Sequence, residues 1–233
     1  MKSFQFSILS ASQKALWPFL QKTAGRFVLY GGTAIALRLG HRKSIDFDFF
    51  TADEFTSDEL VREMDFLAGG KRIQESRNTL TVLLRSPGLE GPVKISFFGG
   101  LKLGRIYQPD TVKDGPRIAS LLDLLGMKCA VVSQRAEAKD YMDIHAIITR
   151  TSLTLTHGIA AARAIYGAQY NGILTLKALC FFEDGNVMTL ADPVRKALTR
   201  FVKACDLSRI PEITCQGTIG EPDHQEAGPN DHR

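Results

Sequence analysis

The chain has 233 residues, of which 44% are hydrophobic and 23% charged, and this balance is typical of a soluble globular protein with a sizeable core. Its net charge of +4 and pI near 8.9 permit a nucleic-acid partner without requiring one. No apolar run reaches the roughly 18 to 20 residues of a membrane helix, and the first twenty residues lack the pattern of a secretory signal. The four scattered cysteines form no Cys-x-x-Cys pair, which argues against a disulfide scaffold or a zinc site. We therefore expect a cytoplasmic protein without membrane contact.

The first part of the chain alternates between helical and strand-like patterns. An apolar run over 27–30 ends at a glycine pair and predicts a buried strand. A short helix over 34–39, stopped by Gly40, and a strand over 45–50 follow it. The other elements predicted here are helices over 12–23 and 56–67, strands over 72–76, 78–85 and 93–98, and a turn at 86–88. The three later strands are expected to extend the sheet in antiparallel fashion.

Beyond residue 116 the apolar spacing becomes helical. Amphipathic helices are predicted over 118–133, 136–149, 155–166, 174–182 and 193–205. From residue 217 the composition offers almost nothing to bury and predicts a disordered tail. We therefore predict an α/β domain over 1–116, a helical domain over 117–216 and a tail over 217–233. The fold class is α/β (α+β), with a mixed sheet flanked by helices and followed by a C-terminal helical bundle.

Asp46 and Asp48 are the strongest candidates for chemistry. They are two residues apart in a predicted strand, so both side chains leave the same face, while Phe47 and Phe49 point to the other. Two neighbouring carboxylates repel each other unless a cation lies between them, and a hard divalent ion such as Mg²⁺ suits them. An Asp-x-Asp alone is also common on exposed strand faces. The apolar residues around this pair favour a central strand, where the two charges need a ligand.

Gly31 and Gly32 precede this strand at a predicted turn from strand to helix. Glycine lets the backbone bend sharply and approach a ligand closely, and the amides of a helix start can hold a phosphate. A glycine pair alone usually marks only a turn. Together with the carboxylate pair it predicts a site for a metal-bound nucleoside triphosphate. The basic residues between the two motifs, Arg38, His41, Arg42 and Lys43, either neutralise triphosphate oxygens or form a solvated loop.

The run from Gly31-Gly32 to Asp46-Phe47-Asp48 resembles the signature of the DNA polymerase β-like nucleotidyltransferase superfamily. The wider pattern resembles its abortive-infection toxin branch, AbiEii. That pattern comprises Gly-Gly-Thr-Ala, Leu37-Arg38, Gly40-His41-Arg42 and Ser44-x-Asp46-x-Asp48, followed downstream by Lys128, Arg135 and Lys139-Asp140-Tyr141-Met142-Asp143. The resemblance spans about residues 25 to 150.

The resemblance implies a role for each matching residue. Asp46 and Asp48 match the metal-binding pair, and Gly31 and Gly32 match the triphosphate-binding turn. The catalytic residues it implies are Asp46, Asp48, Lys128 and Asp140. The nucleotide-binding residues it implies are Gly31, Gly32, Thr33, Arg38, Arg42, Ser44, Ser96, Lys139 and Asp143. Two of these assignments have plain alternatives, because Lys128 could extend from a buried face and acidic helix faces like that of Asp140 and Asp143 are common.

Ser96 stands where the superfamily usually has a third carboxylate, on the strand over 93–98. A serine can hold a water or a phosphate oxygen but brings no charge to a second metal. Three outcomes are open. The enzyme works with a smaller metal site, another acid takes the place of the missing carboxylate, or turnover is lost while nucleotide binding survives.

The resemblance predicts a transfer of a nucleoside monophosphate from an NTP to an acceptor that depends on one or two Mg²⁺ ions and releases pyrophosphate. It makes tRNA or a protein plausible as the acceptor, and a cognate antitoxin plausible as a regulator. The rival prediction is a nucleotide- or partner-binding module that keeps the fold without turnover, motivated by Ser96.

Overall fold

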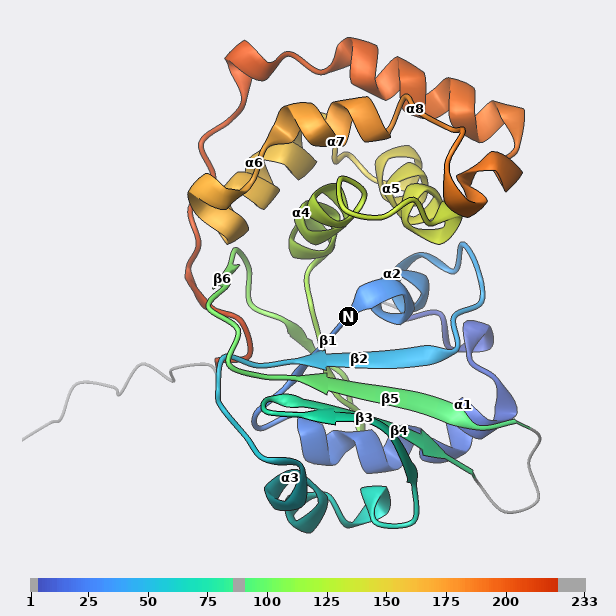
Figure 1. The fold of residues 1–233 in the computed structure, drawn as a ribbon, viewed down its shortest axis with the longest axis vertical. Coiled ribbons are helices and arrows are strands. Elements are labelled where there is room, and N and C mark those ends of the chain that lie inside the picture. The colour runs from blue at the N-terminus through green and yellow to red at the C-terminus, as the bar shows by residue number, and fades with distance from the viewer. Residues whose placement is uncertain (1–3, 86–90, 222–233) are drawn as a thin grey trace, which may run out of the picture.

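The computed structural model describes residues 4–85 and 91–221, and its largest element is a seven-stranded mixed sheet (Figure 1). The strand order is β3-β4-β5-β2-β1-β8-β7. The pairs β1–β8 and β2–β5 are parallel, and the other neighbours are antiparallel. The bounds are β1 Val28–Tyr30, β2 Asp46–Phe50, β3 Lys71–Ser76, β4 Thr79–Leu84, β5 Val93–Phe98, β7 Asp110–Thr111 and β8 Arg117–Ile118. A second sheet has two strands, β6 Gly104–Arg105 and β9 Gly217–Thr218.

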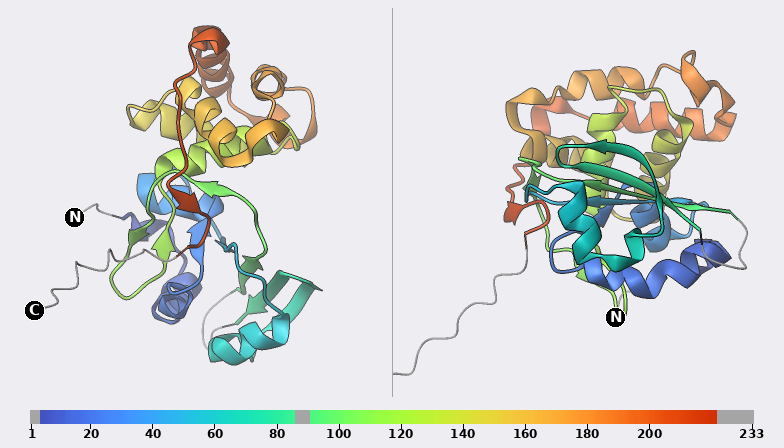
Figure 2. Two further views of the ribbon diagram at one scale, coloured as in Figure 1. Left: turned by 90° about the vertical axis from the view of Figure 1, so that its left-hand side faces the viewer. Right: turned by 60° about the horizontal axis from the view of Figure 1, so that its bottom comes forward.

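The helices cover both faces of this sheet (Figures 1 and 2). The α-helices are α1 Ala11–Leu16, α2 Gly31–Leu39, α3 Ser57–Glu63, α4 Leu121–Val131, α5 Ala138–Arg150, α6 Leu155–Tyr166, α7 Gly172–Ala178 and α8 Asp192–Ala204. The 3₁₀ helices are η1 Phe6–Ile8, η2 Trp17–Thr23, η3 Asp65–Leu67, η4 Gly167–Gln169, η5 Gly185–Thr189 and η6 Leu207–Arg209. In Figure 1, α2 lies between the sheet and the helices of the second half, α4 to α8, which we call the helical half. No helix in the described ranges is long and apolar enough to cross a membrane.

The element types follow the sequence pattern, with local differences. The helix predicted over 12–23 starts at Ala11 instead, because the Ser10 side chain accepts from the Gln13 amide and forms a capping box. It tightens into a 3₁₀ helix at Trp17, where Pro18 removes an amide that an α-helix would use. The turn predicted at 86–88 lies outside the described residues.

The second half starts later than predicted. Ile118, predicted as the first residue of a helix over 118–133, instead forms β8 with Arg117 beside β1. Helix α4 begins only after Ser120, whose hydroxyl accepts from the Asp123 amide. The sheet thus continues two residues past the predicted domain boundary at 116, and the division into domains stays a prediction.

The prediction of a disordered tail is wrong for residues 217–221. Strand β9 pairs with β6, and the Ile219 side chain is fully buried. Arg117 donates to the carbonyl groups of Gly220 and Glu221. One buried isoleucine and a strand pair are enough to fix a segment whose average composition is polar. Figure 2 shows this segment running from the helical half back to the sheet; residues 222–233 lie outside the described part.

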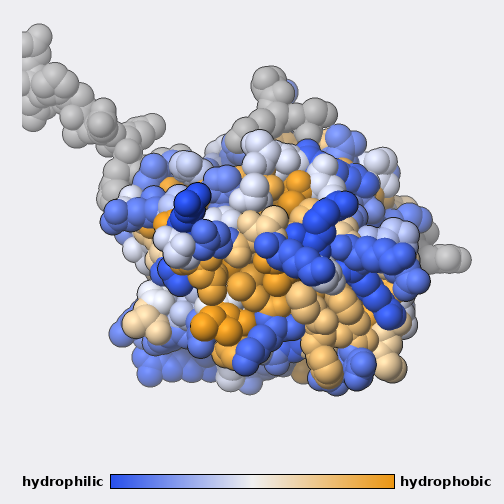
Figure 3. All heavy atoms as spheres, turned by 90° about the horizontal axis from the view of Figure 1, so that it is seen from above, coloured by the Kyte–Doolittle hydropathy of each residue, from blue (hydrophilic) through white to orange (hydrophobic). Residues whose placement is uncertain are grey.

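The surface of the helical half mixes apolar and hydrophilic areas (Figure 3). Its large exposed apolar side chains are Met142, Ile173, Leu174, Phe181 and Met188. A basic surface is formed by Arg195, Lys196, Arg200 and Lys203 of α8.

Candidate active site

Strand β2 holds Asp46 and Asp48 on the face that looks toward the helical half. The alternation is fixed by the opposite face, where Phe47 and Phe49 are fully buried and Phe49 stacks on Phe97 with ring centroids 5.4 Å apart. A slip of one residue would bury both carboxylates in this aromatic core. Burial and the charge of Asp46 raise the pKa of Asp48, although Lys94, Lys128 and a hydrogen bond from Ser96 partly counter this. The pair is therefore held close at an electrostatic cost that a cation would offset.

Gly31 lies against the Asp48 carboxylate, and Gly32 lies against the Arg42 guanidinium. Gly31 has a φ of +71°, and a Cβ there would lie 2.7 Å from Asp48 Oδ2. A Cβ on Gly32 would lie 2.2 Å from the Arg42 guanidinium. Helix α2 starts at this point without a side-chain cap, so its first amides have no side chain that satisfies them. Glycine suits both positions, because Gly31 has a backbone conformation that other residues rarely adopt and because a side chain at either position would displace the carboxylate or the guanidinium.

These groups line a pocket of about 340 Å³ between β2, the loop after α2, and helices α4 and α5. Its lining residues are Gly31, Gly32, Arg42, Lys43, Ser44, Ile45, Asp46, Asp48, Lys128, Arg135 and Lys139. Five of these side chains are cationic and two are carboxylates. A pocket with this surplus of positive charge, beside an uncapped helix start, suits a polyphosphate.

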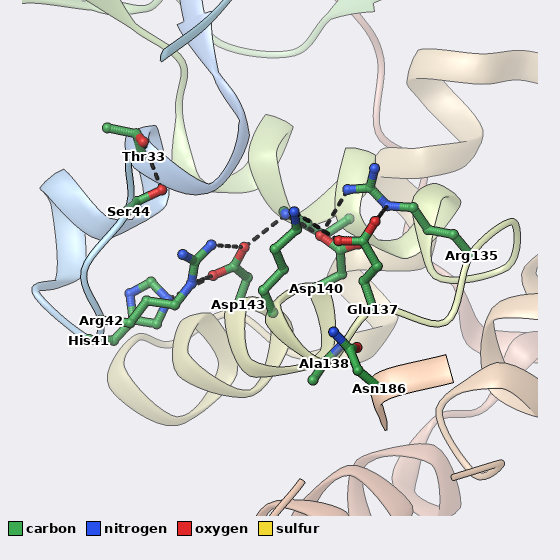
Figure 4. A network of polar contacts seen from close by, with 12 residues as sticks. Thr33, His41, Arg42, Ser44, Arg135, Glu137, Ala138, Asp140, Asp143 and Asn186 are labelled. Carbon is green, nitrogen blue, oxygen red and sulfur yellow. Dashed lines mark hydrogen bonds and ion pairs between the residues drawn. The ribbon is translucent and has the colours of Figure 1, made fainter. Parts of the chain in front are cut away.

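Asp140 and Asp143 lie behind the pocket rather than in it. Both side chains are fully buried on α5, and Lys128 Nζ reaches from α4 to both carboxylates, at 2.8 Å from Asp143 Oδ2. Arg135 Nε lies 2.8 Å from Asp140 Oδ2. Figure 4 shows Arg42 and Arg135 reaching the two carboxylates from opposite sides. The carboxylates predicted to contact substrate are instead placed to hold three of the basic side chains that line the pocket, Arg42, Lys128 and Arg135.

Asp143 has the most complete set of partners. His41 Nε2 lies 2.8 Å from Oδ1, and Arg42 donates from Nε at 2.7 Å and from Nη2 at 2.9 Å. Burial by itself would raise the pKa of Asp143, but the hydrogen bond from His41 and the charges of Lys128 and Arg42 outweigh it and hold the pKa well below its usual range. For Asp140, burial is likewise outweighed, chiefly by Lys128 and Arg135, and its pKa is lowered. Both groups are therefore ionised at neutral pH.

Three other predicted nucleotide-binding residues lie in different surroundings. Ser44 and Lys139 line the pocket, as expected of nucleotide contacts, and Lys139 Nζ also lies 2.8 Å from Glu137 Oε2. Thr33 is buried beneath the pocket, where its hydroxyl contacts the Ser44 hydroxyl at 2.8 Å and the Asp46 carbonyl. It fixes the loop to β2 and does not line the pocket.

Arg38 is separate from the pocket. It donates to the carbonyl groups of Ala119 and Ile118 at 2.7 and 2.9 Å and forms an ion pair with Asp110 at 2.7 Å. With a side chain only 6% exposed, it ties α2 to the end of β8. The structure therefore gives it a structural contact in place of the predicted nucleotide contact.

Strand β5 contributes two side chains to the face of Asp46 and Asp48. Ser96 lies in register with Asp48 and is hydrogen-bonded to its carboxylate. Lys94 lies in register with Asp46, and Lys94 Nζ is 2.7 Å from Asp46 Oδ2. Lys94 was missed in the sequence analysis, although a period of two counted back from Ser96 places it on the same face. Arg135 was also left out of the predicted site residues and lines the pocket.

A second, mostly apolar pocket of about 230 Å³ adjoins the first. Its apolar walls are Phe50, Phe98, Leu124, Met127 and Val131, and it shares Gly31, Asp48, Lys128 and Arg135 with the basic pocket. A ligand that combines an apolar ring with a polyphosphate could occupy both pockets at once.

Residues 19–227 match the family described as nucleotidyl transferase AbiEii toxin, type IV TA system. An uncharacterised protein of Aquifex aeolicus is 32% identical over 166 residues, which cover 68% of this chain and 74% of that protein. Among solved structures, JHP933 from Helicobacter pylori superposes with a TM-score of 0.55 at 15% identity, covering 84% of this chain and 92% of that one. MenT4, a nucleotidyltransferase toxin of Mycobacterium tuberculosis, gives 0.51 at 18% identity, covering 84% and 83%. The fold is thus shared with nucleotidyltransferases, and the chain belongs to the AbiEii nucleotidyltransferase toxin family.

Proposed function

We propose that this protein transfers a nucleoside monophosphate from a Mg²⁺-bound NTP to an acceptor. The observation that carries the proposal is the basic pocket, in which a glycine pair, two carboxylates and five cations surround one space. The triphosphate lies against Gly31, Gly32 and the cations. Its nucleoside extends into the apolar pocket, which Phe50 and Phe98 line.

The carboxylate pair fits a divalent ion. Asp46 and Asp48 present hard oxygen donors on one face of β2, and burial together with the charge of Asp46 raises the pKa of Asp48. Such donors suit Mg²⁺, which takes one or two carboxylates and leaves its other positions to water and phosphate. When bound, Mg²⁺ polarises the phosphoryl oxygens and neutralises charge that develops on them.

The reaction forms a bond between an acceptor oxygen or nitrogen and the α-phosphorus. The bond from the α-phosphorus to the oxygen bridging the β-phosphate breaks, and its electron pair leaves with pyrophosphate. The acceptor proton passes to water or to a carboxylate of the pair. The cations of the pocket stabilise the negative charge of the leaving pyrophosphate. Arg42, Lys128 and Arg135 are already held by Asp140 and Asp143, so little reorganisation of these three is needed.

The acceptor is a tRNA or a protein, and one surface favours RNA. Arg195, Lys196, Arg200 and Lys203 form a basic surface on α8, and phosphate backbones are attracted to such surfaces. A cognate antitoxin is the partner expected from the family.

The test is transfer of label from α-labelled NTPs with Mg²⁺ and either total tRNA or cell protein. We expect labelled product from the wild type and none from Asp46→Ala. Asp53→Ala is the matched control, because it removes an exposed carboxylate just beyond β2 and should leave transfer unchanged. Absence of transfer by the wild type, or equal transfer by Asp46→Ala, would refute the proposal.

The second candidate is a nucleotide-binding module without turnover, favoured by Ser96 where an acid is expected on β5 and by the positive charge of Lys94 beside Asp46. Calorimetry separates the two functions. The module binds Mg²⁺ and NTP and releases no pyrophosphate, whereas the enzyme releases pyrophosphate whenever the acceptor is present.

A further inference from the structure

Lys94 places a positive charge beside the carboxylate pair, two residues before Ser96, where the third carboxylate is expected. The parallel pairing of β2 with β5 runs without a break from Asp46↔Lys94 to Phe50↔Phe98. Ile95 and Phe97 are fully buried on the opposite face, so the register of β5 is fixed and Lys94 must share a face with Asp46 and Asp48. Its ammonium lies 2.7 Å from Asp46 Oδ2, and its side chain is 37% exposed.

Two divalent ions about 3.5 to 4 Å apart require a set of anionic ligands that holds both. Asp46 and Asp48 supply two carboxylates, and β5 adds only Ser96 and Lys94 beside them. Among residues 4–85 and 91–221, no group of three or more His, Cys, Asp or Glu side chains could hold a metal. Three other acids lie near the pocket, and each is in ion pairs. Asp140 and Asp143 are fully buried against Lys128, Arg135 and Arg42, and Glu137 pairs with Lys139 and Arg135. The residues present therefore fit one divalent ion and do not fit two.

We propose that this site binds a single divalent ion, and that the Lys94 ammonium serves as the second cation. This inference rests on the proposed function. With a nucleotide bound, the Lys94 ammonium would pair with the transferred phosphoryl group in place of Asp46, and the Asp46 carboxylate would then be free to hold the divalent ion together with Asp48. Its flexible four-carbon stem and partial exposure allow that movement.

The stoichiometry of Mn²⁺ tests this directly. We would titrate the full chain with Mn²⁺ in the presence of an NTP analogue that cannot be cleaved between the α- and β-phosphates, and count bound ions by electron paramagnetic resonance. We expect one Mn²⁺ for each wild-type chain and two for Lys94→Asp, because the new carboxylate completes a second site. Lys71→Asp, an exposed lysine on edge strand β3 of the same sheet, should keep one. Two ions in the wild type, or one in a folded Lys94→Asp, would overturn the inference and leave the proposed function intact; failure of the wild type to bind Mn²⁺ with the analogue would overturn both.

A second variant tests the inference if Lys94→Asp does not fold. Lys94→Met keeps the length of the stem and removes the charge that competes for Asp46. We expect it to bind Mn²⁺ more tightly than the wild type and to transfer label slower by roughly 100-fold. Lys94→Arg should retain part of the rate. A merely structural pairing with Asp46 predicts tighter Mn²⁺ binding with an unchanged rate, and that result would contradict the assigned role.

Discussion

Replacing Asp143 by asparagine should destabilise the protein more than any change to the pocket-lining carboxylates. The asparagine keeps the size and one acceptor but removes the charge that faces Lys128 and Arg42 from a fully buried position. His41, Arg42 and Lys128 all lie within 2.9 Å of this carboxylate. Removing one partner of a buried ion pair costs about 3 to 5 kcal/mol. Here Arg42 would lose its carboxylate partner, and Lys128 would keep only Asp140. For a chain of this length the loss lowers the melting temperature by roughly 6 to 20 °C.

Unfolding in urea measures the effect with two probes. The single tryptophan, Trp17, is buried and lies 6.2 Å from the Phe47 ring between centroids, so its fluorescence reports on the sheet half. Far-ultraviolet circular dichroism reports mainly on the helices. Asp65→Asn is the control, because it breaks only an exposed ion pair with Lys22 and should not change the midpoint. A variant Asp143→Asn that unfolds within about 1 kcal/mol of the wild type would refute the interpretation of the buried carboxylates as supports of the basic pocket.

Three further changes have expected outcomes of different kinds. Asp48→Asn should abolish transfer and leave the melting temperature equal or higher, because burial and Asp46 raise the pKa of Asp48 and its ionised form costs stability near neutral pH; a large drop in melting temperature would contradict this. The pKa values of Asp140 and Asp143 are depressed in the folded state, so their stabilisation is present above the unfolded pKa near 4 and is lost as the pH falls below it. Urea midpoints measured from pH 6 to pH 3 should therefore fall more steeply for the wild type than for Asp143→Asn, and parallel curves would count against the assignment. Phe98→Ala should weaken NTP binding by roughly 5- to 150-fold through lost stacking and leave inhibition by inorganic tripolyphosphate unchanged, as competition assays would show. If the variant bound both ligands more weakly by the same factor, the placement of the nucleoside in the apolar pocket would be wrong.

The part of the site formed by local sequence could be predicted without a structure. Gly31, Gly32, Asp46 and Asp48 are placed by a strand, a turn and a period of two, and each of these is a property of a few consecutive residues. The resemblance to the AbiEii family added Lys128 and Lys139, and both line the pocket. The mixed sheet and the helical second half also followed from local periodicity.

The roles of the other residues depend on contacts between distant segments. The spacing of Asp140 and Asp143 shows that they share a face of α5, but packing against α4 and the loop at residues 41–42 decides that this face is buried. Arg38 does not line the pocket, because its guanidinium donates to carbonyl groups at the end of β8, some 80 residues later in the chain, which need hydrogen-bond donors. The order of strands, which puts β5 beside β2, is likewise not visible in the sequence pattern and is what brings Lys94 to Asp46.

The buried carboxylates explain how a pocket with so much positive charge can be held in place before a nucleotide binds. Five cations lining one pocket repel one another, and a long lysine on a surface loses side-chain entropy when a ligand immobilises it. Here Lys128 is 9% exposed and already fixed by Asp140 and Asp143, and Arg42 is fixed by the same Asp143. Because the ion pairs form on folding, the side chains of Lys128 and Arg42 lose their entropy when the protein folds. This loss lowers the stability of the fold and does not weaken nucleotide binding. The affinity of the pocket for a triphosphate thus depends on two acids that cannot reach it, and the stability of the fold depends on the basic residues that bind the substrate.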